Sequence, residues 1–248
     1  MIKLNYILVE INELNKLTVE SQGVVFEDRI LELSQKLDSW YDQLPYEMRD
    51  TPENLLHWAS QGLGRVFVAV YLGYYHFGQL LFYQFLHEDC HSTLTAAHSY
   101  ALQCKAHSIS LCEITYRAHS TPGCDVLYNM VGHVLVIAST VQIHILLFGE
   151  DDEQIRLARA RLERNFEILT KLRTYWATLE ASFSRLRAFH KACQKSMQTS
   201  FRLDQWMLSF LSEFAKPMDD RYLEAGRSDS EPEWLVDNLA ISPQSSNG

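Results

Sequence analysis

The chain has 248 residues, of which 47% are hydrophobic and 21% are charged, which is the composition of a globular protein with a sizeable core. Its ten glycines and six prolines are few for this length, and their scarcity argues against a turn-rich all-β fold. The formal net charge of −9 leaves the chain without an overall electrostatic footprint for nucleic acid.

The cysteines exclude a thiolate zinc cluster built from neighbouring residues. No two of them form a CxxC pair, which such a cluster needs. An odd number of dispersed cysteines fits reduced, buried thiols in an intracellular compartment. The five cysteines are Cys90, Cys104, Cys112, Cys124 and Cys193.

The N-terminal part of the chain predicts a series of helices. The first 14 residues favour an amphipathic helix over a signal peptide, because polar residues interrupt their apolar run. Apolar residues recur at three- and four-residue spacing from residue 30 to residue 44, and Pro45 ends this stripe. Thr51 and Pro52 have the pattern of an N-cap followed by a first-turn proline, so they predict the start of the next helix.

Two segments, 66–86 and 126–148, lack Asp, Glu, Lys and Arg over the roughly 20 residues that a transmembrane helix needs. Both contain several His, Gln or Asn residues, which are costly in lipid and acceptable between packed helices. Clusters of Lys and Arg, which usually flank a membrane span, are also missing. We therefore interpret both segments as core helices of a soluble bundle, with a membrane protein as the less favoured alternative.

Histidines offer two candidate metal sites, and neither is convincing from the sequence. His87 and His91 lie four residues apart in HEDCH, but this is not the HExxH pattern and no third ligand follows at a suitable spacing. We interpret the stretch as a polar helix C-terminus, where the helix dipole favours histidine. His133 and His144 share one helix face, and we expect them to be buried and hydrogen-bonded.

The segment 150–216 contains no Gly or Pro and keeps three- and four-residue apolar spacing, so it predicts at least two packed helices. We expect a break near residues 173–176 or near residues 198–200. The Asp151-Asp152 and Asp219-Asp220 pairs each lack the third acid of the magnesium-binding motif of class I terpene synthases. No GxSxG, P-loop or GxGxxG motif occurs either, so the sequence predicts no catalytic, cofactor-binding or metal-binding residue and no enzyme.

Three stretches together resemble the regulatory middle-homology domain of fungal binuclear zinc-cluster transcription factors. Their order and spacing carry the resemblance, which extends over roughly residues 1–215, and the apolar run 134–148 stands where that family has a buried helix. The three stretches are 33–45 with Trp40 and Leu44-Pro45, 70–81 with Tyr75-His76, and 159–186 with Trp176 near the junction of a helix pair.

The resemblance implies an all-α helical scaffold that regulates transcription in the nucleus. It also implies protein partners, namely a DNA-binding regulator or the transcription machinery, and leaves a small-molecule effector and a homo-oligomer open. The chain departs from the family because the six-cysteine zinc cluster and its basic linker are absent from this sequence. We therefore expect no direct nucleic-acid binding by this chain, and no cofactor. The alternative function is a helical enzyme of small-molecule metabolism.

The composition changes after residue 216. Residues 217–248 contain seven acidic and two basic residues, a net charge of −5. We therefore divide the chain into a helical regulatory domain, 1–216, and an acidic, partly disordered tail, 217–248. Around Trp234 the tail interleaves acidic and apolar residues, which is the pattern of a disordered activation segment, although a merely solvated tail fits equally well.

Overall fold

The computed structural model describes residues 2–87, 96–213 and 216–219, and every regular element in these ranges is a helix. The predicted all-α, multi-helix fold is therefore confirmed. The division at residue 216 stays a prediction, because residues 220–248 lie outside the described ranges. The elements are α1 (Ile2–Glu20), α2 (Glu27–Asp42), η1 (Tyr46–Met48), α3 (Pro52–Ser60), α4 (Gly64–Phe82), η2 (Tyr83–Leu86), α5 (Ala97–Ser120), α6 (Met130–Phe148), α7 (Asp152–Arg173), α8 (Leu179–Lys195), α9 (Met197–Ser200) and α10 (Gln205–Ser212).

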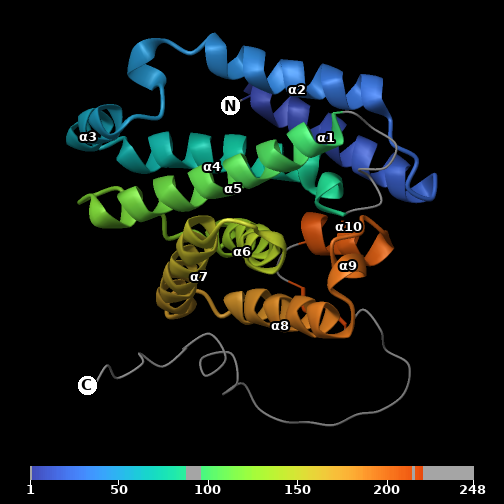
Figure 1. Cartoon of the computed structure of the whole chain (residues 1–248). Helices are drawn as coiled ribbons and strands as arrows, with labels where there is room; N and C mark the ends of the chain where they lie inside the picture. Colours follow the sequence, from blue (N-terminus) through green and yellow to red (C-terminus); the bar gives the residue numbers. More distant parts are fainter. Residues whose placement is uncertain (1, 88–95, 214–215, 220–248) are drawn as a thin grey trace, which may run out of the picture.

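The helices form layers around the long pair α4 and α5 (Figure 1). Helices α1, α2 and α3 pack against α4, and α6 packs against α5 on the other side of the pair. Helices α7 and α8 cover α6, and α10 returns to contact α1. Segments far apart in the sequence therefore meet in one body, and α4, α5 and α6 occupy its middle.

A close approach between α4 and α5 depends on a glycine. A Cβ atom at Gly78 would lie 2.4–2.5 Å from the imidazole ring of His107, so no larger residue fits without movement of that ring. His107 therefore lies directly on the α4 backbone, and the two helices pack tightly along their length.

Helix α6 is the most apolar element, and it lies in the core. Among the described residues it is the one helix long and apolar enough to cross a membrane, and 78% of its most apolar window is buried inside the protein. Leu135, Val136 and Ile137 are fully buried although they point in successive directions around the helix. This burial agrees with the interpretation of segment 126–148 as a core helix.

Several predicted helix ends are found at the expected residues. The side chain of Thr51 accepts a hydrogen bond from the backbone N–H of Asn54 at 3.1 Å, which confirms the N-cap before Pro52. Asp151 caps α7 by accepting the N–H of Glu153 at 3.2 Å. The segment 150–216 breaks at both expected places, after α7 and again around α9.

The segment 66–86 does not form one continuous helix. Helix α4 ends at Phe82, and a 3-10 turn continues to Leu86. In this turn the hydroxyl of Tyr83 lies 2.9 Å from that of Thr140, and the carbonyl of Leu86 lies 2.9 Å from Nε2 of His144. The tighter turn thus directs polar groups to partners on α6. His87 is extended, and residues 88–91 of HEDCH lie outside the described ranges.

Candidate functional site

Two of the stretches that carry the family resemblance meet in space. Trp40 and Tyr41 of α2 both stack on Tyr74 of α4, with ring centroids 5.3 and 5.4 Å apart and interplanar angles of 26°. Tyr74 also contacts the ring of His107 of α5, with ring centroids 5.5 Å apart. Aromatic packing therefore joins α2, α4 and α5 next to the Tyr75-His76 pair.

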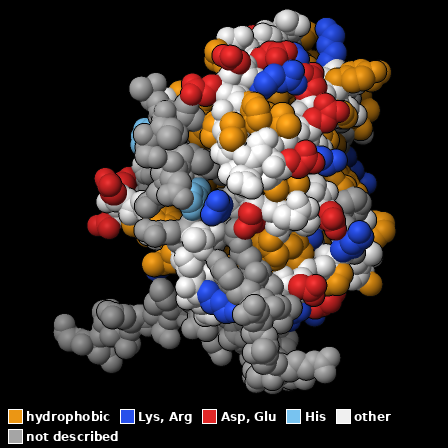
Figure 2. Space-filling view, turned by 90° about the vertical axis from the view of Figure 1, so that its right-hand side faces the viewer, with side chains coloured by type: hydrophobic (Ala, Val, Ile, Leu, Met, Phe, Trp, Pro, Cys, Tyr) orange, Lys and Arg blue, Asp and Glu red, His pale blue; other side chains and the backbone are white. Residues whose placement is uncertain are grey.

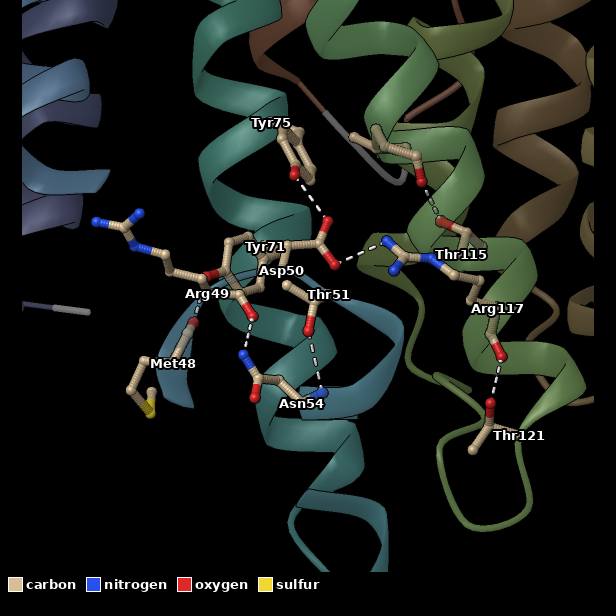
Figure 3. Close-up of polar contacts among 11 residues, drawn as sticks. Met48, Arg49, Asp50, Thr51, Asn54, Tyr71, Tyr75, Thr115, Arg117 and Thr121 are labelled. Carbon is tan, nitrogen blue, oxygen red and sulfur yellow. Dashed lines mark hydrogen bonds and ion pairs between the residues drawn. The ribbon is translucent and has the colours of Figure 1, made fainter. Parts of the chain in front are cut away.

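Beside this aromatic packing lies the Asp50 cluster, which consists of Asp50, Tyr75 and Arg117 (Figure 3). One carboxylate oxygen of Asp50 accepts the hydroxyl of Tyr75 at 2.7 Å. The other oxygen accepts a guanidinium N–H of Arg117, also at 2.7 Å. The Asp50 side chain is only 5% exposed, so the turn before α3 is fixed to α4 and α5 by a charge pair whose carboxylate is buried.

Further hydrogen bonds hold the turn that presents Asp50. The side-chain amide of Asn54 donates to the carbonyls of Tyr46 at 2.7 Å and of Arg49 at 2.9 Å. The hydroxyl of Tyr71 donates to the carbonyl of Met48. The carbonyls of Tyr46 and Arg49 also accept backbone N–H groups, at 3.0 and 2.9 Å, so the two side chains add to the backbone bonds that hold this turn. The α3 start and the middle of α4 therefore position the carboxylate together.

Burial keeps the phenol of Tyr75, and the imidazole of His107 beside it, in their neutral forms. It raises the pKa of the Tyr75 phenol well above its usual value, and the negative charge of Asp50 raises it further. Burial also lowers the pKa of His107 to about 4. At neutral pH the phenol is thus a donor and the imidazole is uncharged. Because both oxygens of Asp50 already accept hydrogen bonds, the arrangement is suited to holding helices together.

A second buried polar group is Arg185 of α8. We call this residue, together with the backbone carbonyls that accept its hydrogen bonds, the Arg185 cluster. Its guanidinium donates to the carbonyls of Ser209 at 3.1 Å, of Lys216 at 3.3 Å and of Phe210. Arg185 is 1% exposed. Burial lowers its pKa to about 10, against the opposing charge of Glu213. The cation therefore lies at the C-terminal end of α10, where the helix dipole is negative.

The expectation for His133 and His144 is confirmed. Both are buried, and their Nε2 atoms lie 3.1 Å from the carbonyl of Leu211 and 2.9 Å from that of Leu86. The ring of His133 also contacts that of His76 at 5.7 Å. Burial lowers the pKa of His76 to about 3 and that of His133 to about 4. The imidazoles of His76 and His133 are therefore neutral parts of the core.

Neither metal site considered from the sequence is assembled in the described ranges, where no three His, Cys, Asp or Glu side chains are grouped to hold an ion. Of the HEDCH stretch only His87 is described. Asp151 serves as the N-cap of α7, which fits the interpretation of Asp151-Asp152 as a helix start. Asp220 lies outside the described residues, so the second Asp pair is not described as a unit.

A shallow groove of about 530 Å³ lies between α1 and α2. Its walls include Tyr6 and Trp40, and ion pairs lie along it. Lys36 contacts Glu10 at 2.7 Å and Glu32 at 2.8 Å, so the charges nearest the groove neutralise one another. On the face shown in Figure 2, acidic and basic side chains are likewise interspersed among apolar ones. These surfaces carry no feature that selects a ligand.

The sequence indicated the aromatic residues of the site but not its charged ones. Asp50 directly precedes a recognisable N-cap, so the sequence identifies it as a polar turn residue. This local pattern does not indicate that its side chain is buried. Arg117 lies in the last turn of α5, where a basic residue is ordinarily a dipole partner.

Comparison of the chain with protein-family models, with curated proteins and with solved structures finds no match.

Proposed function

We propose that this chain is a regulatory helical scaffold of the middle-homology type that acts in transcription regulation. The observation that carries the proposal is the meeting of the resembling stretches, where Trp40 stacks on Tyr74 beside the Tyr75-His76 pair. In addition, Trp176 stands at the junction of α7 and α8, and its indole N–H donates to the carbonyl of Leu127.

The chemistry of the Asp50 cluster favours this function over that of a helical enzyme. A catalytic carboxylate needs an oxygen that can reach a substrate, whereas both oxygens of Asp50 are engaged by Tyr75 and Arg117. A scaffold needs fixed contacts between its helices, and a charge pair of this kind fixes how the helices pack.

Charge points to proteins as the partners. At −9 overall, the chain would be repelled by the phosphates of DNA, so we propose that it reaches its genes through a DNA-binding regulator or through the transcription machinery in the nucleus. The acidic tail would make the protein contact that activates transcription, and Trp234 would be the apolar residue of that contact.

A tethering experiment tests the proposal. The full chain is fused to a heterologous DNA-binding domain and measured on a reporter gene in a fungal host. We expect reporter expression to rise at least several-fold over the DNA-binding domain alone, and to fall back in a matched Trp234→Ala fusion expressed at the same level. Equal expression with and without the chain would overturn the proposal.

A further inference from the structure

The turn after α5 contains a hydroxyl residue followed by proline, Thr121-Pro122. Three of the six prolines follow Ser or Thr, in the pairs Thr51-Pro52, Thr121-Pro122 and Ser242-Pro243. A Ser or Thr directly before proline is what proline-directed protein kinases recognise. The third pair lies outside the described residues, so the first two can be compared in the structure.

The backbone at Thr121 is suited to a kinase. The residue is extended, with φ −108° and ψ 121°, as expected before a proline. Pro122 and Gly123 are exposed, and Gly123 turns the chain away with φ +78°. On the other side, the N–H of Thr121 donates to the carbonyl of Ala118 at 3.2 Å in the last turn of α5, and such terminal turns open readily.

Basic side chains of α7 lie near the end of α5. Arg164 of α7 donates to the hydroxyl of the preceding Ser120 at 3.2 Å, and its guanidinium lies 4.7 Å from the centre of the Tyr116 ring. No carboxylate in the described ranges forms an ion pair with Arg164. The nearby carboxylate of Asp125 contacts Lys171 at 3.3 Å and His119 at 2.9 Å. A phosphate on Thr121 would therefore meet an exposed guanidinium whose charge no carboxylate neutralises.

Thr51 makes a matched control. The hydroxyls of both threonines are engaged, but in different ways: that of Thr121 donates to the carbonyl of Arg117 at 2.8 Å at the end of α5, whereas that of Thr51 accepts the N–H of Asn54 as the N-cap of α3. Its neighbours include the buried carboxylate of Asp50 and the carboxylate of Glu53 in the first turn. A phosphate there would break the cap and add negative charge beside an existing carboxylate. Figure 3 places both threonines, at the ends of α3 and α5 that the Asp50–Arg117 pair joins.

We propose that Thr121 is a phosphorylation site for a proline-directed protein kinase and that Arg164 receives the phosphate. In the reaction, Oγ1 of Thr121 forms a bond to the γ-phosphorus of ATP while the bond to ADP breaks, and the hydroxyl proton passes to a carboxylate of the kinase. The resulting phosphate would tie the connection after α5 to α7. This inference does not depend on the proposed function.

The first experiment locates the modification. The purified full chain is incubated with a proline-directed kinase and ATP, and the phosphate is mapped by mass spectrometry of peptides. We expect phosphate on Thr121 and none on Thr51 in the folded chain. Pro122→Ala and Thr121→Ala should each abolish the signal at this position, and Thr51→Ala should leave it unchanged. Absence of phosphate on Thr121, or preferential modification of Thr51, would overturn the proposal.

The second experiment tests the role of Arg164. Phosphorylation should raise the melting temperature by about 2–4 °C, because charge-assisted hydrogen bonds to Arg164 outweigh the unfavourable place of a negative charge at a helix C-terminus. The ³¹P resonance should titrate at a lower pH than that of a free phosphothreonine. Arg164→Gln should remove both shifts without preventing phosphorylation. Equal shifts in this variant would exclude Arg164 as the phosphate's partner.

Discussion

Two arginine sites join the helices of this protein in different ways. In the Asp50 cluster, Arg117 keeps 30% of its side chain exposed and faces a carboxylate. In the Arg185 cluster, the arginine is 1% exposed and donates only to backbone carbonyls. The first site cancels one charge with another, whereas the second places a cation against the partial charges at the end of α10.

The two clusters are therefore expected to stabilise the fold for different physical reasons. A carboxylate that loses its partner remains a buried charge, so the Asp50 cluster is sensitive to removal of either member. Carbonyls that lose Arg185 remain neutral groups, but the vacated volume of the arginine is large. We therefore expect the Arg185 site to depend mainly on the filling of space and on satisfied carbonyls, and the Asp50 site to depend mainly on charge.

The largest effect should follow from Arg185→Ala. The substitution leaves a cavity and unsatisfied carbonyls, and should lower the free energy of unfolding by about 3–5 kcal/mol. Arg185→Met fills most of the volume and should cost less than about half as much. Urea denaturation of both variants measures the difference. Equal losses would show that the guanidinium, and not its volume, stabilises this end of the molecule.

Asp50→Asn should have the next largest effect. It keeps the shape of the side chain but removes its charge, leaving Arg117 beside a neutral amide, and should cost about 2–3 kcal/mol. In a double-mutant cycle with Arg117→Gln, the two losses should not add, because each variant removes the same charge pair. Fully additive losses, measured by the same denaturation, would argue against a coupled pair.

The contrast between these sites also explains what could be predicted from the sequence. Helices follow from apolar spacing and from local signals such as Thr51-Pro52, which act within a few residues. Asp50 meets its partners 25 and 67 residues away, and no local pattern encodes such a distance. The aromatic part of the site was indicated because Trp40 and Tyr75-His76 stand in recognisable contexts.

The burial of Arg185 is even harder to predict from the sequence. Its partners are backbone carbonyls, whose positions depend on where α10 ends and not on which side chains it carries. In the sequence it is one of several basic residues on an amphipathic helix, with Arg187 and Lys191 close by. Only the return of the chain through α9 to α10 buries it. Backbone recognition of this kind becomes visible only in three dimensions.

Acid should weaken the Arg185 side of the molecule through His133. Burial, together with the charge of Arg185, lowers the pKa of His133 to about 4, from a usual value of 6.5. The unfolded chain therefore binds more protons between these values, and the free energy of unfolding falls as the pH drops from 6.5 towards 4. The loss from this residue is at most about 1.4 kcal/mol per pH unit.

His133→Gln tests this contribution, because glutamine can still donate to the carbonyl of Leu211 but does not titrate. Denaturation at several pH values should give a shallower acid slope for the variant than for the unmodified chain. The two should differ little at pH 7.5, where the imidazole is neutral in both the folded and the unfolded states. An unchanged slope would assign the acid sensitivity to other groups.

The smallest effect should come from Tyr75→Phe, which removes a single neutral donor from the Asp50 cluster. The carboxylate keeps Arg117, so we expect a loss of only about 1–2 kcal/mol. Tyr46→Phe is the matched control, because the ring of Tyr46 is 67% exposed, and it should change the free energy of unfolding by less than about 0.5 kcal/mol. If Tyr75→Phe cost as much as Asp50→Asn, the phenol would stabilise Asp50 as strongly as the guanidinium does. The cluster would then act as a hydrogen-bond network and not as a charge pair.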